Sequence, residues 1–236
     1  MIRVTIFNEF YHEKTEESVR AIYPDGIHGA LKEHLSDEEI TVKTVTLDDP
    51  ECGLTDEVLA NTDVLIWWGH VKHADVPDGV ASRVQNAVLS GMGMIFLHSA
   101  HHSKPFKLLM GTPCSLGWRE DGDREYVWVC DPSHPIAQGI DRYIELEHEE
   151  TYTEPFSIPE PDKLIFIGSY EGGEVFRAGC CYRRGYGKIF YFQPGHESYP
   201  TYHKPEIIRV IKNAVHWTYS DYRRVIDCPQ VSKISG

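Results

Sequence analysis

Two short segments of the chain are apolar at every position, VLIWW at residues 64–68 and MIFL at residues 94–97. Successive side chains of a β-strand point to opposite faces of the sheet, so a strand with only apolar residues must be covered on both faces. Such strands are typical of parallel sheets, whose crossover helices cover the two faces. The two runs therefore predict an α/β fold with a mostly parallel sheet and helices on both faces.

The segments before about residue 112 continue this pattern. Strands are predicted at residues 2–7 and 40–47, with a polar loop at 8–17 and a helix after Pro24. Thr55 has the character of an N-cap for a further helix. Valines at i, i+4 and i+8 within residues 80–88 predict another helix.

After residue 112 the pattern changes to successive strands without intervening helices. They are predicted at residues 118–129, 143–148, 163–170, 174–182 and 188–193. Pro205 then opens an amphipathic helix. We predict a single α/β domain over residues 1–221, with additional antiparallel strands, and a C-terminal surface extension at residues 222–236. The extension is equally compatible with packing on a second copy, as in a homo-oligomer, or with a frayed end.

Charge and hydropathy exclude several classes of partner. The chain has 23 Lys and Arg against 36 Asp and Glu, a formal net charge of −13. A protein this acidic repels phosphate backbones and anionic lipids, so we expect no nucleic-acid and no membrane partner. The longest apolar stretch is far shorter than the roughly 20 residues of a membrane span. The first ten residues, MIRVTIFNEF, lack the basic and apolar segments of a signal peptide, which predicts a cytoplasmic protein.

Histidines follow several of the predicted strands. The chain has 13 of them, and ligands of open parallel sheets bind at the carboxyl ends of the strands. The polar residues that follow the strands are Glu9, His70, His73, His98, Ser99, His101, His102, His148, Glu149, Glu150, His196 and Glu197. We interpret His12, His28, His34, His134, His203 and His216 as structural or surface residues.

Each of these residues also has an ordinary structural explanation. His70 and His73 are as compatible with loop hydrogen bonds as with a site, and His98 with a buried core position. His148 is as compatible with a solvated acidic edge. The tryptophans at 67 and 68 are better explained by aromatic packing than by sugar stacking. The convergence of four strand ends is what favours a functional site.

Imidazoles and carboxylates together suit a divalent metal such as zinc. The candidate ligands are His70, His98, His101, His148 and His196. Without a metal, the same side chains suit acid–base chemistry near neutral pH. The chain lacks GxGxxG, GxxxxGK[ST] and GxSxG motifs, and its six cysteines have no CxxC spacing, so nucleotide-binding and serine-hydrolase functions lose their usual support.

Several segments together resemble the ThuA-like (trehalose utilisation) family. They are VLIWWGHVKH, FLHSAHHSKPF, HPIAQGI, HEETY and GKIFYFQPGHESYP, and the resemblance extends over about residues 1–219. It implies a flavodoxin-like fold of the class I glutamine amidotransferase-like type, and a role in the metabolism of trehalose or related disaccharides through 3-keto sugars.

One departure from the amidotransferase pattern decides against that activity. The superfamily's nucleophilic cysteine follows a buried strand, and in GMIFLHSAH its place is taken by His98. The segment FQPGHE resembles the one that carries the superfamily's catalytic histidine, so His196 matches that residue and Glu197 could orient it. Ser99 is a poor substitute nucleophile without the flanking glycines.

Two functions follow from the resemblance. The first is a metal-assisted hydrolase or lyase acting on a 3-keto-sugar or glycoside, with Glu150 or His196 as the base. The expected catalytic residues are His98, Glu150, His196 and Glu197, and the expected substrate-binding residues are Glu9, Ser99 and Tyr152. The second is a non-catalytic carbohydrate-binding or accessory subunit of a sugar oxidoreductase pathway. A closed structural zinc site is a third possibility.

Overall fold

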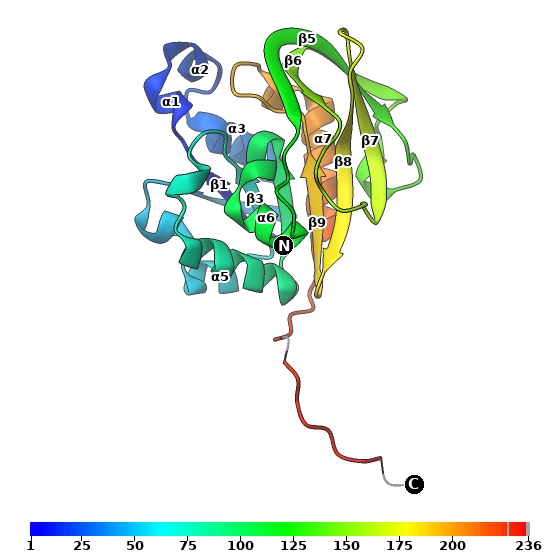
Figure 1. Cartoon of the computed structure of the whole chain (residues 1–236). Helices are drawn as coiled ribbons and strands as arrows, with labels where there is room; N and C mark the ends of the chain where they lie inside the picture. Colours follow the sequence, from blue (N-terminus) through cyan, green and yellow to red (C-terminus); the bar gives the residue numbers. More distant parts are fainter. Residues whose placement is uncertain (226, 235–236) are drawn as a thin grey trace.

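A computed structural model describes residues 1–225 and 227–234. Its centre is one nine-stranded sheet in the order β2-β1-β3-β4-β9-β8-β7-β5-β6 (Figure 1). The parallel half consists of β1 (Ile2–Asn8), β2 (Ile40–Thr46), β3 (Val64–Trp68), β4 (Gly93–Leu97) and β9 (Gly187–Phe192). The antiparallel half adds β5 (Gly117–Val129), β6 (Tyr143–Thr153), β7 (Lys163–Tyr170) and β8 (Val175–Arg184). The predicted α/β fold, parallel first and antiparallel later, is confirmed.

The helices form two groups, one on each face of the sheet. A right-handed crossover places its helix on one face when the chain moves in one direction along the sheet, and on the opposite face when the chain moves in the other direction. The connections after β1 and β3 run in opposite directions from the middle of the parallel half. One group contains α3 (Gly26–Leu35) and α7 (Pro205–Thr218), which contact each other. The other contains α4 (Asp56–Ala60), α5 (Asp78–Leu89) and α6 (Lys104–Met110), with α5 in contact with both α4 and α6. Thr55 caps α4, accepting a hydrogen bond from the Val58 amide, as expected.

The two all-apolar runs are the best-buried strands. Every residue of β3 and β4 is buried. Trp67 and Trp68 are 1% and 0% exposed, which leaves neither indole free to stack on a sugar. The Trp68 indole Nε1 donates to the carbonyl of Gly195, tying β3 to the loop after β9.

Two predicted boundaries were wrong. The segment expected as a polar loop contains α1 (His12–Thr15) and the start of α2 (Glu17–Ile22); helices this short offer too few turns for periodicity to detect. The strand expected at residues 143–148 continues to Thr153 as β6. Its polar second half was not recognised as strand because it carries the buried carboxylates Glu149 and Glu150.

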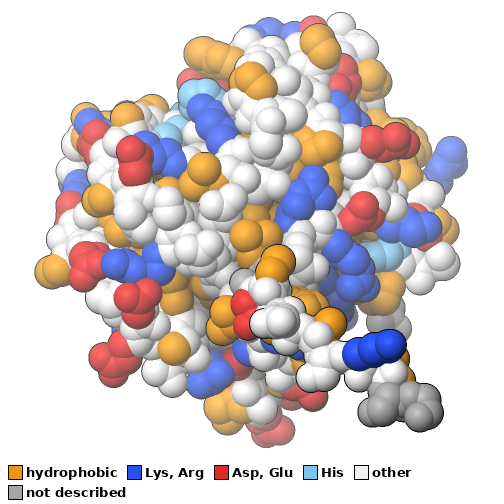
Figure 2. All heavy atoms as spheres, turned by 60° about the horizontal axis from the view of Figure 1, so that its bottom comes forward, with side chains coloured by type: hydrophobic (Ala, Val, Ile, Leu, Met, Phe, Trp, Pro, Cys, Tyr) orange, Lys and Arg blue, Asp and Glu red, His pale blue; other side chains and the backbone are white. Residues whose placement is uncertain are grey.

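The described part of the C-terminal extension has no regular structure and is exposed. Among the described residues, no helix has the length and apolar character needed to cross a membrane. On the face shown in Figure 2, acidic and basic side chains are interspersed rather than gathered by sign.

Candidate functional site

The carboxyl ends of the parallel strands open into a cavity of about 530 Å³. Its walls come from α1, from the loops after β3, β4 and β9, and from β5 and β6. Of the residues proposed from the sequence, those that line it are His70, Ser99, His101, Glu150, Tyr152, His196 and Glu197. The topology therefore brings most of the predicted site residues together.

His98 lies at the turn between β4 and the 3₁₀ helix that follows it, with a φ of 53°. A non-glycine residue with a positive φ is uncommon, and such strain concentrates at functional sites. The imidazole is fully buried. Its Nδ1 donates to the Gln193 carbonyl at 2.9 Å, and its Nε2 lies 2.9 Å from Glu150 Oε2.

This pairing sets the charge state of His98. Burial alone would lower the pKa of the ring, but the hydrogen bond and charge of Glu150 outweigh burial and raise the pKa to about 9. Burial acts against ionisation of Glu150 as well, and the contact with His98 more than compensates, so the Glu150 pKa is lowered. His98 and Glu150 thus form a buried imidazolium–carboxylate pair. With both ring nitrogens engaged, His98 is not available as a metal ligand.

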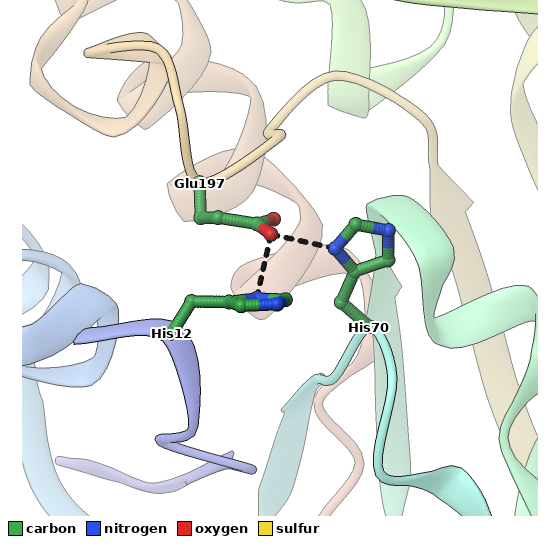
Figure 3. A group of neighbouring side chains, drawn as sticks. All are labelled: His12, His70 and Glu197. Atoms are coloured by element: carbon green, nitrogen blue, oxygen red, sulfur yellow. Dashed lines mark hydrogen bonds and ion pairs between the residues drawn. The ribbon is translucent and has the colours of Figure 1, made fainter. Parts of the chain in front are cut away.

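A second carboxylate holds two more imidazoles (Figure 3). Glu197 Oε1 lies 2.6 Å from His12 Nδ1 and 2.6 Å from His70 Nδ1. Burial would raise the pKa of Glu197, but the hydrogen bonds from His12 and His70 lower it far below its usual range. In His12, burial opposes protonation and Glu197 overcomes it, so the His12 pKa is raised.

His12 is the functional candidate that the sequence analysis missed. It lies in the loop predicted at residues 8–17, and histidines in predicted loops or helices are interpreted as structural or surface residues. The signal that could have found it was its position four residues after the end of β1, one of the strands whose carboxyl ends form the site.

His196 lines the cavity, and its ring centroid lies 5.1 Å from that of His70 and 5.3 Å from that of His98. Its Nδ1 accepts from the Ser198 amide at 3.2 Å, and within the described residues its buried Nε2 has no hydrogen-bond partner. Burial, followed by the nearby charge of His98, lowers the pKa of His196 to about 4. The ring is therefore neutral at physiological pH.

Glu149 fixes the loop that carries His196. Consecutive residues of a strand face opposite sides, so Glu149 points away from the cavity that Glu150 faces. Its carboxylate accepts from the amides of Gly195 and His196 and from the Thr201 hydroxyl. Glu149 is thus a structural anchor beneath the site.

Two predicted substrate-binding residues are engaged by the backbone of the β3 loop. The Glu9 carboxylate accepts from the amides of Val71 and Lys72, both at 2.9 Å. The Ser99 hydroxyl donates to the Gly69 carbonyl at 2.8 Å. These contacts hold the loop that presents His70. Tyr152 does line the cavity, with its ring stacked on that of His98.

Two predicted metal ligands lie apart from the others. His101 donates from Nδ1 to the Cys114 carbonyl, on the far side of Tyr152 from His98. His148 is exposed in a separate groove, and its Nδ1 donates to the Gly122 carbonyl. A register shift in the β5–β6 pairing, between Leu146 and Glu149, breaks the alternation of side chains there.

Two groups of side chains in the described part of the chain can bring three ligand atoms within 4.8 Å of one another. They are His12–His70–Glu197 and His70–Glu150–His196. In the first group, Glu197 Oε1 lies 2.6 Å from a nitrogen of each histidine, which is a hydrogen-bond distance. Two ligand atoms of a tetrahedral zinc lie roughly 3.3 Å apart, as follows from the zinc–ligand bond lengths. The atoms of the first group are therefore too close together to ligate one zinc ion.

The second group fits a divalent metal better. Because Glu197 accepts from His70 Nδ1, the other nitrogen of that ring is free to ligate, the usual carboxylate–histidine–metal arrangement. The buried Nε2 of His196 has no hydrogen-bond partner among the described residues, whereas Oε2 of Glu150 is already paired with His98 Nε2. Ligation through His196 Nε2 requires the tautomer with its proton on Nδ1, so the Ser198 amide would have to give up its acceptor.

Comparison with known proteins decides the family. The family model described as trehalose utilisation, ThuA, matches residues 3–218. The chain belongs to the ThuA family. The resemblance noted in the sequence is thereby confirmed over almost its whole extent.

Solved structures agree on the fold of this ThuA-family protein. A ThuA-like protein from Parabacteroides merdae has a TM-score of 0.70 and 14% identity, covering 97% of this chain and 93% of that one. A ThuA-like protein from Bacteroides uniformis has a TM-score of 0.69 and 14% identity, covering 94% and 92%. The cytoplasmic protein STM1381 from Salmonella typhimurium LT2 has a TM-score of 0.63 and 12% identity, covering 93% and 100%. No curated protein gave a significant match.

Proposed function

We propose that this ThuA-family protein is a metal-assisted enzyme that cleaves 3-keto-glycosides, the substrate being a disaccharide such as 3-keto-trehalose. The observation that carries the proposal is the group His70, Glu150 and His196 facing the cavity, with ligand atoms within 4.8 Å of one another and with His196 Nε2 left without a hydrogen-bond partner among the described residues. The family's description as trehalose utilisation supports a disaccharide substrate.

The metal would be a divalent ion such as zinc, held by His70, Glu150 and His196. A divalent ion there would polarise the ketone and stabilise the negative charge that develops on its oxygen. His98 would keep Glu150 ionised and oriented, because the two side chains form a buried pair. Glu197 would fix the His70 ring through Nδ1.

We assign the base to His12, since Glu150 and His196 belong to the proposed ligand set. Nδ1 of His12 lies 2.6 Å from Glu197 Oε1, so Nε2 would be the basic nitrogen, as in other carboxylate–histidine pairs. His12 lines the cavity. Should the site work without a metal, Glu150 or His196 is the alternative base.

The reaction uses the acidity that a 3-ketone gives to the hydrogen on C2. His12 Nε2 takes that proton, the electron pair forms a C1=C2 double bond, and the bond from C1 to the glycosidic oxygen breaks. The protonated His12 returns the proton to the departing oxygen. Water then adds across the double bond, with hydroxyl at C1 and hydrogen at C2, so the net reaction is hydrolysis.

The test is to incubate the purified protein with 3-keto-trehalose and follow products by NMR in D₂O. The proposal expects glucose and 3-keto-glucose, with deuterium at C2 of the keto sugar. Binding without turnover, across a series of added divalent metals, would overturn the enzymatic function and favour the accessory sugar-binding subunit.

A further inference from the structure

The histidines around the cavity fall into two groups. The acidic group comprises His12, His70, His98 and His196 with Glu150 and Glu197. The neutral group comprises His73, His101 and His102, whose rings lie 5.7 Å (73 to 102) and 5.8 Å (101 to 102) apart, centroid to centroid. All three rings of the neutral group line the same cavity.

Tyr152 lies between His98 of the acidic group and His101 of the neutral group. Its ring stacks on His98 at 5.1 Å on one side and meets the edge of His101 at 5.6 Å on the other. The proposed chemistry uses only the acidic group. The neutral group therefore forms a second compartment of the cavity, whose role the proposed reaction does not explain.

The spacing of these three rings argues against a metal as their ligand, because within the described residues they are not part of any group that brings three ligand atoms within 4.8 Å of one another. Burial lowers the pKa of His101 to about 3 and also lowers the pKa of His102. Nearby imidazoles act on His101 and Lys107 acts on His102, and both further disfavour a positive charge. These two rings are thus neutral imidazoles at physiological pH.

A neutral imidazole offers one donor and one acceptor, the same combination that a sugar hydroxyl can match. In His101 the roles are fixed, because Nδ1 donates to the Cys114 carbonyl at 2.7 Å and leaves Nε2 as an acceptor. The hydroxyl-bearing Ser115 lines the same cavity. This compartment is therefore chemically matched to a neutral, polyhydroxylated ligand.

An aromatic side chain completes the compartment. Trp118 lines the cavity although 67% of its surface is exposed. It pairs directly with Tyr152 in the β5–β6 register, so the two side chains lie on the same face of the sheet. An exposed indole next to hydrogen-bonding groups provides an apolar face for a pyranose ring.

We infer that His73, His101, His102 and Trp118 form a second sugar subsite, which holds the ring on the other side of the cleaved glycosidic bond. The inference rests on the proposed function for the identity of the ligand. A cavity of about 530 Å³ is within the usual range for a ligand of disaccharide size. This subsite makes the protein selective for disaccharides over simple alkyl glucosides.

The test is calorimetric binding of two unreactive sugars, trehalose and methyl α-glucoside, to the full-length protein. Wild type should bind trehalose about tenfold more tightly than the methyl glucoside. Trp118→Ala and His102→Ala, both at exposed positions, should weaken trehalose binding about tenfold and leave methyl glucoside binding within about twofold. Thermal melts check that the variants fold.

The matched controls are Tyr143→Ala and His148→Ala, an exposed aromatic and an exposed histidine outside the cavity wall; both should bind like wild type. Equal weakening of both sugars in the Trp118 and His102 variants, unchanged trehalose binding in them, or no sugar binding by wild type would each overturn the subsite. Turnover of the 3-keto sugars is measured separately, so loss of the proposed chemistry leaves the binding result intact.

Discussion

Glu197 Oε1 lies 2.6 Å from His12 Nδ1, linking the loop after β9 to the short helix after β1. The same oxygen contacts His70 at the same distance. One carboxylate thereby orients an imidazole that we propose as the base and another that we propose as a metal ligand. Replacing these three residues one at a time separates the two roles.

Substitution of His12 should remove the base and leave the metal. We expect His12→Gln to lower kcat on 3-keto-trehalose about 10²- to 10⁴-fold, the usual contribution of general base catalysis. Bound metal per chain, measured by elemental analysis, should stay at the wild-type value. A kcat equal to that of wild type in this variant would refute the assignment of the base. The control is His34→Gln, which replaces an exposed histidine.

Substitution of Glu197 should move the pH dependence of turnover. His12 must be unprotonated to act as a base, so the rate falls as the pH drops below its pKa, which Glu197 raises. In Glu197→Gln this acidic limb of the kcat profile should shift to lower pH, with a lower maximum because the ring is less well held. An acidic limb that stays in place would show that another group titrates there.

The His98–Glu150 pair should contribute to stability in a defined pH window. A pKa raised from 6.5 to about 9 in the folded state stabilises the fold fully below pH 6.5, and this stabilisation is lost as the pH rises through 9. The lowered pKa of Glu150 acts in the opposite direction, so its contribution is lost as the pH falls through the acidic range.

Chemical denaturation of chelator-treated protein tests this window. His98→Asn should be less stable than wild type by on the order of 3 kcal/mol near pH 6, and the difference should shrink above pH 9. A difference that does not depend on pH between 6 and 10 would mean that packing, rather than the charged pair, accounts for the loss.

Glu149 should matter for the loop rather than for the chemistry. Its carboxylate is buried and accepts from three backbone amides, those of Glu150, Gly195 and His196, and from the Thr201 hydroxyl. We expect Glu149→Ala to cost about 2–4 kcal/mol of unfolding free energy, because several buried donors lose their acceptor. Glu149→Gln keeps one carbonyl acceptor and should cost less; hydrogen exchange of the amides at Gly195 and His196 would locate the effect.

The sequence allowed the parallel half of the fold to be predicted well, because β3 and β4 are buried on both faces and therefore apolar throughout. It also selected His70, Glu150, His196 and Glu197 as site residues, although Glu150 lies within β6 rather than after its end. The sequence could not show which of these side chains contact one another. Which face a side chain takes depends on a local register shift, and this shift separates His148 from the site.

The role of His12 also could not be predicted from the local sequence. Its role depends on a contact with Glu197, which lies 185 residues later in the chain by their numbers. Helix α1, which carries it, spans only four residues, too few for a hydrophobic pattern. Long-range packing against the β9 loop, rather than local sequence, gives this histidine its place.

The central claim is that His70, Glu150 and His196 hold a divalent metal. Elemental analysis of tag-free protein purified without chelator tests it most directly, with wild type, His70→Ala, His196→Ala and the control His148→Ala measured side by side. We predict close to one divalent ion per chain in wild type and in the control, and its loss in the two variants. Metal-free wild type that also gains no thermal stability from added zinc, manganese or nickel would contradict the account.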